Sequence, residues 1–560
     1  MFDAIVVGSG ISGGWVAKEL AEKGLKTLVI ERGKHVEHGA DYKDGLAPWE
    51  LENYGMVPEE EADRDYFIQK RCYAFSTANQ QFWVKDSDHP YTFPPEKPFL
   101  WIRGYHLGGR SLMWGRQSYR MSPMDFESNA KDGIGSDWPI RYDDLKPWYD
   151  HVERFAGISG AKDGLAQLPD GEFLPPMAFT GTEEDFKQKL EASWPTRKLI
   201  IGRCAHLTEV RPQHEELGRT ACQYRSVCER GCSFGAYFSS LSATLPAAER
   251  TGNLTIVTDA VVHSVIHDPK TGKATGVRVV DSNTKQGRTY EAKLVFLNAS
   301  TIPTAQILLN SKSEAFPTGL ANRSDAVGRY LMDHISLSSS ATYPGFETHY
   351  HRGRRPNGFY IPRYRNFTEQ AQGFLRGFGF QGGIYRENWR RGVREPGIGA
   401  ELKSKMRAPG PWRLNLTGFG EMLPRPDNRV TMHASNVDKW GIPIAHVDCG
   451  LGPNEQAMLD QVGKDAREIL EKVGGTNVYV GKHYGGLGLG IHEMGTAHMG
   501  KDPTKSVLNK YNQTHDVPNL FITDGSAMAS GGCQNPSLTY MAMSARGAHY
   551  AAEFLKEGRI

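Results

Sequence analysis

A glycine-rich turn close to the N-terminus constrains the fold of this chain more than any other feature. A short apolar run leads into Gly8, Gly10 and Gly13 at the spacing GxGxxG, and a helical pattern follows over residues 12–23. A second apolar run then ends in Glu31. Glycines at this spacing allow a tight turn, a close approach of backbone to a pyrophosphate, and close packing of helix on strand. The sequence therefore predicts a dinucleotide-binding β-α-β unit at the start of the chain.

The acid that ends the second run narrows the choice of dinucleotide. Glu31 can accept hydrogen bonds from an adenosine ribose, and its negative charge disfavours a ribose 2′-phosphate. FAD and NAD therefore both fit better than NADP. The helix that follows the glycines would point its unpaired N–H groups and its positive dipole end at the phosphates. The plainer alternative is an ordinary β-α-β corner that binds nothing.

The rest of the chain mixes helical and strand patterns, and no repeat of fixed period occurs. Residues 40–100 look irregular and residues 160–200 look loop-like. Helices are predicted at residues 143–157 (with Asp143 as the cap), at 454–473, and from Pro536 to the C-terminal end; strands are predicted at 254–257, 260–267, 274–281, 289–297, 335–343, 412–423, 429–433 and 519–523.

Charge and hydropathy give no reason to expect nucleic acid or a membrane as partner. The 560 residues carry 66 basic and 64 acidic side chains, which leaves a net charge of +2. No uncharged stretch has the length and composition of a spanning helix. A strand begins almost at Met1, without the basic and apolar regions of a signal peptide. A cytoplasmic location is expected, and export to the periplasm together with a signal-bearing partner is the alternative.

Four later segments carry a family resemblance: RGYHLGGRSLMWG at residues 103–115, VGRYLMDH at 327–334, HEMGTAHMG at 492–500, and the stretch from TDGS at 523 to NPSLT ending at 539. Together with the N-terminal unit they resemble the glucose–methanol–choline (GMC) oxidoreductases, in that family's order and over nearly the whole chain. Within the family the chain is most similar to the pyranose-oxidase and bacterial sugar-dehydrogenase branch.

The resemblance implies FAD as cofactor and a fold class of α/β plus α+β. An FAD-binding Rossmann-like domain would hold an inserted substrate domain built on a large antiparallel sheet. The expected FAD domain is discontinuous (residues 1–160, 200–335 and 485–560), and the substrate domain covers 336–484 with parts of 41–100 and 161–199. Pyranose oxidases tether FAD through a histidine where Met113 stands here, so non-covalent FAD is expected. The implied cofactor-binding residues are Gly8, Gly10, Gly13, Glu31, Arg103, Gly108, Gly109, Met113, Asp524 and Pro536.

The C-terminal block supplies two candidate catalytic residues. Flavin-dependent alcohol oxidation needs a base for the hydroxyl proton and a donor that holds the oxygen. His492 matches the family's base, and its reference pKa of about 6.5 suits that role. Asn535 matches the second member, and its amide can donate without taking the proton. The plainer alternatives are a satisfied core histidine and a helix cap, since Asn535 is also predicted to cap a helix that starts at Pro536.

Three of the seven cysteines lie close together, as Cys222, Cys228 and Cys232. Three thiolates suit a [3Fe-4S] cluster, and bacterial FAD-dependent glucose dehydrogenases, which this segment resembles, carry one on a cysteine trio. The alternatives are unligated thiols, a zinc site completed by His206 or His214, and a disulfide that leaves one thiol free. The other four, Cys72, Cys204, Cys449 and Cys533, are expected to be buried packing residues.

The expected function is FAD-dependent oxidation of a sugar or glycoside hydroxyl to a ketone, with C3 as a candidate position. Hydride would pass to flavin N5, and the electrons to the cluster or to an external acceptor. Candidate partners are a small export or maturation subunit and a cytochrome c or other acceptor. The pocket rim is expected in residues 350–360, which include Arg352, Arg354 and Arg355, and in the aromatic stretch 378–385. Two alternatives are an oxidase that uses O2 and a flavin-binding protein without net redox turnover.

Overall fold

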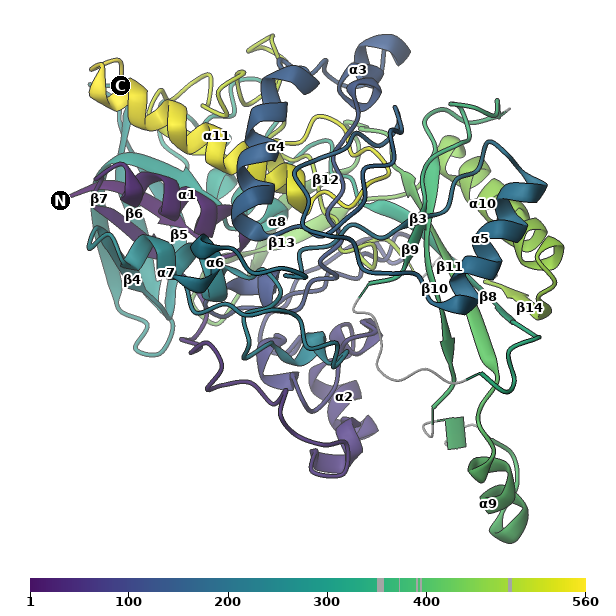
Figure 1. Ribbon diagram of the computed structural model, residues 1–560. Coiled ribbons are helices and arrows are strands. Elements are labelled where there is room, and N and C mark those ends of the chain that lie inside the picture. The colour runs from purple at the N-terminus through teal and green to yellow at the C-terminus, as the bar shows by residue number, and fades with distance from the viewer. Residues whose placement is uncertain (350–356, 372, 389–390, 393–394, 482–485) are drawn as a thin grey trace.

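A seven-stranded sheet and a six-stranded sheet organise the computed structural model (Figure 1). The structure describes residues 1–349, 357–371, 373–388, 391–392, 395–481 and 486–560. One sheet is mainly parallel and stands in the first and last parts of the chain, while the other is antiparallel and formed mostly by the middle. This architecture confirms the predicted fold class.

The seven-stranded sheet has the order β4-β2-β1-β7-β6-β5, and β15 also pairs with β7. β1 is parallel to β2 and β7, β2 to β4, and β7 to β15, whereas β5, β6 and the start of β7 form an antiparallel meander. Parallel neighbours end at one edge, so the residues that follow β1, β2, β7 and β15 meet there. The strands are β1 Phe2–Val7, β2 Thr27–Ile30, β4 Leu254–Val257, β5 Ala260–Asp268, β6 Lys273–Asp281, β7 Gly287–Leu297 and β15 Leu520–Ile522.

Helix α1 (Ile11–Glu22) packs between α11 (Ser537–Lys556) and the short α7 (Leu245–Glu249), and α4 (Tyr142–Ala156) packs on α11. Figure 1 shows α1, α4 and α11 gathered at one end of the molecule. Gly14 permits the close approach of α1, because a Cβ there would lie 2.5 Å from Thr244 Oγ1. The first and last helices of the chain therefore share one layer. The remaining helices are α2 Glu59–Asp65, α3 Pro123–Asp132, α5 Gly181–Ser193, α6 Pro212–Glu215, α8 Thr301–Asn310, α9 Gly399–Arg407 and α10 Pro453–Lys472.

The six-stranded sheet has the order β14-β8-β11-β10-β9-β3. Its central strands β8, β11 and β10 pair antiparallel over long registers, and α10 and α5 lie on its outer side (Figure 1). The strands are β3 Ile200–Ile201, β8 His334–Thr342, β9 Phe359–Ile361, β10 Phe378–Arg386, β11 Trp412–Glu421 and β14 Thr476–Val480; β12 Arg429–Val437 and β13 Pro443–Asp448 form a separate pair.

Alternation along these strands decides what faces α10. Leu337 on β8 and Leu416 on β11 belong to the apolar core shared with α10. Their neighbours Ser338 and Thr417 point to the opposite face, because successive side chains of a strand alternate. The helix approaches closely where the strand has no side chain, since a Cβ at Gly418 would lie 2.4 Å from Val462 Cγ1. The sheet is therefore apolar on its outer face and polar on its inner face.

Three local predictions need correction. Residues 160–200 are not all loop, because α5 lies within them; its start carries a capping box from Thr180 to Glu183 that could have been read in the sequence. The cap of α4 is Arg141 and not Asp143. Helix α11 begins at Ser537 with Pro536 at the cap position, so Asn535 does not cap it.

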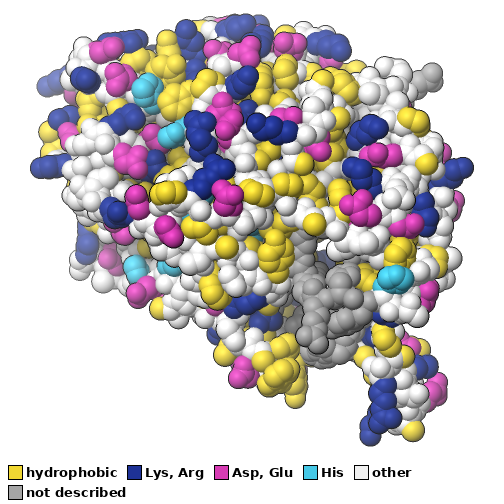
Figure 2. Space-filling view, in the orientation of Figure 1, with side chains coloured by type: hydrophobic (Ala, Val, Ile, Leu, Met, Phe, Trp, Pro, Cys, Tyr) yellow, Lys and Arg dark blue, Asp and Glu magenta, His cyan; other side chains and the backbone are white. Residues whose placement is uncertain are grey.

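Within the described part of the chain, no helix has the length and apolar character needed to cross a membrane. The face seen in Figure 2 carries Lys and Arg side chains interspersed with Asp and Glu over most of its area.

Candidate active site

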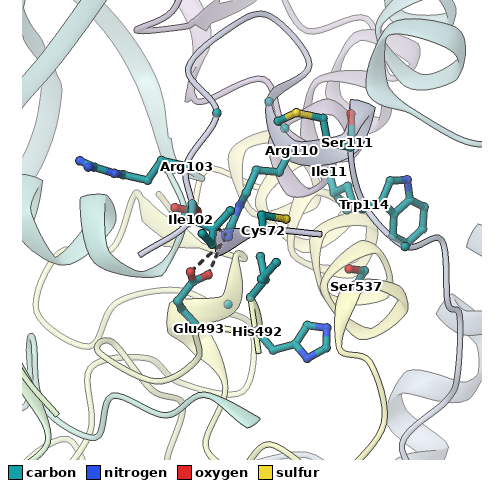
Figure 3. Close-up of a pocket in the computed structure, with 18 of the residues that line it drawn as sticks. Ile11, Cys72, Ile102, Arg103, Arg110, Ser111, Trp114, His492, Glu493 and Ser537 are labelled. Atoms are coloured by element: carbon teal, nitrogen blue, oxygen red, sulfur yellow. Dashed lines mark hydrogen bonds and ion pairs between the residues drawn. The ribbon is translucent and has the colours of Figure 1, made fainter. Parts of the chain in front are cut away.

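A cavity of about 1040 Å³ is lined by residues from both sheets. The strand ends of the parallel sheet bring Gly8, Glu31, Asn298 and Asp524 to its wall, in each case from the residues directly after or close to the last strand residue. Segments that are hundreds of residues apart thus meet in one place. Figure 3 shows part of this wall, with Glu493 pointing toward Arg110.

The first glycine turn forms bare backbone at one end of the cavity. Gly8 has φ +98°, and a Cβ on Gly13 would lie 1.9 Å from Gly8 O, so the turn and the helix tolerate no side chain there. A Cβ on Gly10 would meet nothing within 4 Å, because that side of the turn faces the cavity. Gly109 of the second glycine segment lies beside Gly10, because a Cβ added to Gly109 would be 3.4 Å from Gly10 Cα. Two glycine segments therefore make one cradle that a phosphate could approach closely.

Glu31 ties the two glycine segments together. Its Oε2 accepts from Ser9 N at 3.1 Å and from Ser9 Oγ at 2.5 Å, and its Oε1 accepts from Gly33 N at 2.9 Å. Ser9 Oγ in turn accepts from Gly108 N at 2.9 Å. Burial raises the pKa of Glu31 from its ordinary value, opposed by these hydrogen bonds. Glu31 lines the cavity while it also holds the turn in shape.

The other predicted cofactor residues fall into two groups. Arg103, Gly109, Met113 and Asp524 line the cavity together with Gly8, Gly10 and Glu31. Gly13, Gly108 and Pro536 do not appear in the lining and lie behind it, although Asn535 and Ser537 on either side of Pro536 do.

Arg103 and Asp524 are held by the protein itself. Arg103 donates from Nη2 to Asp86 Oδ1 at 3.1 Å, and its guanidinium lies over the rings of Tyr91 and Trp101. Asp524 Oδ2 accepts from Ser300 N at 2.9 Å and from Thr304 Oγ1 at 2.7 Å. These bonds join β15 to the start of α8 at the cavity edge.

His492 and Asn535 are in contact at the cavity wall, with His492 Nε2 3.1 Å from Asn535 Nδ2. On its other side, His492 Nδ1 lies 2.9 Å from Nδ1 of His334, a residue that the sequence had offered only as part of a motif. Burial holds the pKa of His492 well below its ordinary value, and His334 and Arg110 lower it further. The imidazole is therefore neutral at pH 7.

An ion pair joins the second glycine segment to the catalytic block. Arg110 donates from Nη1 to Glu493 Oε1 at 3.1 Å and from Nη2 to Oε2 at 2.7 Å (Figure 3). Arg110 and Glu493 both line the cavity, and Glu493 directly follows His492 in the sequence. Planar two-point pairing fixes geometry as well as charge. Sequence reasoning missed this pair, since the two residues are 383 positions apart.

The inner face of the antiparallel sheet supplies hydroxyl and amide groups to the opposite wall. Ser338 pairs in register with Thr417, which pairs with Gln381, so three polar side chains lie in a row across β8, β11 and β10. Ser338 Oγ and Thr417 Oγ1 are 3.1 Å apart. Ser336 and Asn415 line the cavity beside this row. These five side chains (Ser336, Ser338, Gln381, Asn415 and Thr417) are called the polar row below.

The predicted rim stretch 378–385 reaches the cavity through Gln381, Gly382, Gly383 and Tyr385, but not through its phenylalanines. Phe378 and Phe380 pack in the core on the outer side of the sheet, as alternation requires, and only Tyr385 of the aromatics there lines the cavity. In the other predicted stretch, Arg352, Arg354 and Arg355 lie outside the described residues.

The cysteine trio lies next to the large cavity. Cys222, Cys228 and Cys232 line a small hollow of about 20 Å³, and Cys228 lines both cavities. Cys228 Sγ is 3.5 Å from His206 Nε2. All seven cysteines are free, and Cys72, Cys204, Cys449 and Cys533 are buried as expected. Among the described residues, no group of three His, Cys, Asp or Glu side chains is arranged to hold a metal ion.

Comparison with known proteins places this geometry in a family. The N-terminal model of the GMC oxidoreductases matches residues 2–336, and their C-terminal model matches residues 424–544. The 2-methyl-1,2-propanediol dehydrogenase of Mycolicibacterium austroafricanum is 29% identical over 98% of this chain and 94% of that protein. The fructose dehydrogenase large subunit of Gluconobacter japonicus is 26% identical over 99% of this chain and 98% of that protein.

A solved structure of pyridoxine 4-oxidase from Mesorbium loti superposes with a TM-score of 0.60 over 98% of each chain, at 16% identity, which shows the shared fold. The family models cover more than half of the chain and include both glycine segments, His492 and Asn535. The chain belongs to the GMC oxidoreductases, a family of FAD-dependent enzymes that act on CH–OH groups.

Proposed function

We propose that this protein is an FAD-dependent dehydrogenase that oxidises a hydroxyl group of a sugar or glycoside to a ketone. The observation that carries the proposal is the contact between His492 and Asn535 in a cavity that extends from the glycine cradle to the polar row. One cavity thus offers a neutral base, a donor, a place for a dinucleotide and a polar surface for a substrate.

The cavity fits FAD on its own geometry. Gly10 and Gly109 present bare backbone to the space, and a side chain on Gly10 would enter it freely. We assign the pyrophosphate to this cradle and the adenosine ribose to Glu31, with Arg103, Met113 and Asp524 around the flavin. FAD, when bound, supplies the hydride acceptor. Met113 offers no ring nitrogen for a covalent tether, so the proposed FAD is non-covalent.

His492 would act as the base. Its neutral imidazole can accept the substrate's hydroxyl proton at neutral pH, a step that contributes about 10²–10⁴ in rate in other enzymes. Asn535 Nδ2 lies against His492 Nε2. When a substrate binds, this N–H would turn to the substrate oxygen, which would free Nε2 and hold the hydroxyl beside it. Because the amide has no charge, it orients the oxygen without raising the pKa of His492.

The polar row favours a substrate with several hydroxyl groups. Ser338, Thr417 and Gln381 are neutral, and each can both donate and accept, as a sugar's hydroxyl groups do. The names of the two relatives above, a diol dehydrogenase and a fructose dehydrogenase, agree with a polyhydroxylated substrate. We propose C3 as the first position of the sugar to test for oxidation.

Cys222, Cys228 and Cys232 would be the ligands of the proposed [3Fe-4S] cluster, which would supply an electron acceptor when bound. Three thiols line one hollow, and one of them, Cys228, also lines the large cavity. The hollow has room for about one water molecule, so the loop would have to open around a cluster. Iron and acid-labile sulfide analysis of protein purified without oxygen tests this part; absence of both leaves a direct transfer from flavin to the acceptor.

We further propose that residues 1–160, 200–335 and 485–560 form the FAD domain and that 336–484, with parts of 41–100 and 161–199, form the substrate domain. The membership of the two sheets supports this division, except that β3 (Ile200–Ile201) pairs in the antiparallel sheet. A small export subunit and a cytochrome c or similar acceptor are the proposed partners, with a periplasmic site of action if such a subunit exists and a cytoplasmic one if it does not.

Anaerobic reduction of the bound flavin tests the proposed function. The purified holoenzyme is mixed with sugars, glycosides and simple diols, and the loss of visible flavin absorbance is followed. Bleaching by a sugar or glycoside, reversed rapidly by an electron-accepting dye and slowly by air, is expected. Stoichiometric peroxide on admission of air would instead identify an O2-using oxidase. No bleaching with any alcohol would leave only a flavin-binding role and would overturn the proposal.

A further inference from the structure

The motif at residues 327–334 has no role in the function proposed above, yet its last two residues both contact the segment that carries His492. Asp333 Oδ1 accepts from the backbone N of His492 at 3.0 Å and of His334 at 2.8 Å. Its Oδ2 accepts from the N of Gly488 at 2.8 Å and of Gly490 at 3.1 Å. One buried carboxylate therefore fixes the backbone on which the catalytic histidine stands.

The ring of His334 has a defined hydrogen position. Its Nε2 lies 2.8 Å from the carbonyl oxygen of Gly532. A carbonyl oxygen only accepts, so Nε2 carries the hydrogen. Burial lowers the pKa of His334 to about 4, although the contacts with Gly532 and Gly531 oppose this. At neutral pH the ring is therefore uncharged, and its Nδ1 carries a lone pair.

That lone pair determines where the hydrogen of His492 lies. His334 Nδ1 and His492 Nδ1 are 2.9 Å apart, and only His492 is left to supply the hydrogen between them. A neutral His492 protonated at Nδ1 has its lone pair at Nε2. The far end agrees, because Asn535 Nδ2 donates to His492 Nε2 and Asn535 Oδ1 accepts from Gln381 Nε2. The whole chain of bonds from Gly532 to Gln381 has one consistent direction.

We propose that His334 is a positioning residue that holds His492 in the Nδ1-protonated tautomer, so that Nε2 is the atom that accepts the substrate's proton. In that step the substrate O–H bond breaks, an N–H bond forms at Nε2, and the electron pair stays on the substrate oxygen. The other tautomer would present an N–H to the substrate and could not take its proton. This inference rests on the proposed role of His492 as base.

Two variants of His334 distinguish the loss of its hydrogen-bond acceptor from a change in side-chain shape. Asn places an amide oxygen near the position of Nδ1, whereas Leu has a similar shape and no acceptor. His334→Leu is expected to slow anaerobic flavin reduction about 10- to 100-fold, as loss of an orienting partner does elsewhere. His334→Asn is expected to recover most of that loss. The apparent sugar affinity should change less than about twofold in both, because His334 does not line the cavity.

A matched control measures what loss of a buried histidine costs by itself. His498 is as buried as His334, follows the same segment, and bonds to Ser136 Oγ at 3.0 Å without touching His492. His498→Leu is expected to lower the melting temperature while the folded, flavin-bound fraction reduces at the wild-type rate. Equal slowing in His498→Leu and His334→Leu would assign both effects to general loosening and would overturn the inference.

Nitrogen NMR of histidine-labelled holoenzyme reads the tautomer directly, without turnover. The signals of His492 are identified as those lost in His492→Gln. A pyrrole-type signal at Nδ1 and a pyridine-type signal at Nε2 are expected in the wild type, and a mixture of tautomers in His334→Leu. A wild-type His492 protonated at Nε2 refutes the inference. A wild-type reduction rate in His492→Gln would refute the proposed function itself, and the two failures are thus distinguishable.

Discussion

Burial prepares His492 for its proposed role and also makes it sensitive to charge. Its ring is flanked by His334, Asn535 and Arg110, and none of these supplies a negative charge that would favour the imidazolium. A base works only above its own pKa, so a depressed pKa keeps His492 deprotonated through neutral pH. The amide at position 535 adds no charge that would oppose this effect of burial.

Replacing Asn535 by Asp is expected to raise the pKa of His492 and so to favour its protonated form. A carboxylate about 3 Å from an imidazole raises the imidazole pKa by about 1–3 units. The acid limb of the flavin-reduction rate, measured by stopped flow from pH 5 to 9, should therefore move to higher pH in Asn535→Asp. Asn535→Leu removes the amide without adding charge and should lower the rate with no upward movement of the limb. An unchanged limb in Asn535→Asp would contradict the electrostatic account of His492.

The presence of Met113 leads to a separate prediction, that FAD is bound without a covalent bond to the protein. The residue lines the cavity, and a thioether has no ring nitrogen that could bond to flavin. Acid precipitation of the native protein should therefore release all of the flavin into the supernatant, where its absorbance matches that of free FAD. Yellow colour that stays with the precipitated protein would show a covalent bond elsewhere.

Individual residues were predictable where a motif fixes them and unpredictable where folding brings them together. Gly8, Gly10 and Glu31 follow from their spacing, and His492 and Asn535 from resemblance. The contact of His334 with His492 spans 158 positions, and no local pattern announces it. The same holds for Gln381, which reaches Asn535 only because β10 lies across the cavity from α11.

At the scale of elements, the glycines of the turn before α1 serve two different purposes, helix packing and access for the cofactor. Gly13 is required by packing, whereas Gly10 faces open space. Gly10→Ala is expected to leave the melting temperature of the apoprotein unchanged and to weaken FAD binding about 5- to 150-fold, the usual cost of about 1–3 kcal/mol for overfilling a site. Titration of apoprotein with FAD measures this. Gly181→Ala, at an equally open position in α5, should bind FAD as the wild type does.

The polar row is expected to contribute to the affinity for the substrate through the side chains of β8, β10 and β11. Thr417→Val keeps the shape of the side chain and removes its hydroxyl, with an expected rise in KM for the best sugar of about two- to tenfold from the loss of one hydrogen bond. Thr255→Val on β4, outside the cavity, serves as the control. If both variants keep the wild-type KM, the polar face of β8, β10 and β11 does not contact the substrate.

Most elements were foreseeable because their periodicity is strong. The strands β4 to β7 and the helix α10 lie within a few residues of the predicted limits. The exceptions have physical reasons. Helix α5 is polar on most of its surface, so its apolar period is weak despite the Thr180 cap. Phe378 and Phe380 were assigned to the pocket by chemistry alone, but alternation along β10 turns them into the core.

At the scale of the whole molecule, buried neutral histidines link stability to pH. Burial lowers the pKa of His498 to about 4 from its ordinary 6.5. A group with a depressed pKa of this kind contributes stability above about pH 6.5, and this is lost progressively as the pH falls toward 4. The free-energy difference between wild type and His498→Leu should therefore shrink by about 1 kcal/mol from pH 6.5 to 5.5. Urea unfolding at both pH values measures it, and a constant or growing difference would contradict the burial of a neutral ring.

The molecule as a whole brings five distant parts of the chain to one cavity. Gly8, Gly109, Asn298, His492 and Asn535 all line it, although they are spread over more than 500 residues. The order of the motifs predicts that they belong to one site, and the ends of the parallel strands explain how they come together. The sequence could not foretell the cavity's polar wall, because that wall depends on which face of the second sheet turns inward.

The most direct test of this account is the rate of anaerobic flavin reduction in His492→Gln. The variant should fold, retain FAD and keep the wild-type absorbance spectrum, because Gly10, Gly109 and Glu31 are untouched. Mixed with the best sugar substrate in a stopped-flow instrument, it is predicted to reduce its flavin about 10²- to 10⁴-fold more slowly than the wild type. A flavin-bound His492→Gln enzyme that reduces at the wild-type rate would contradict the account.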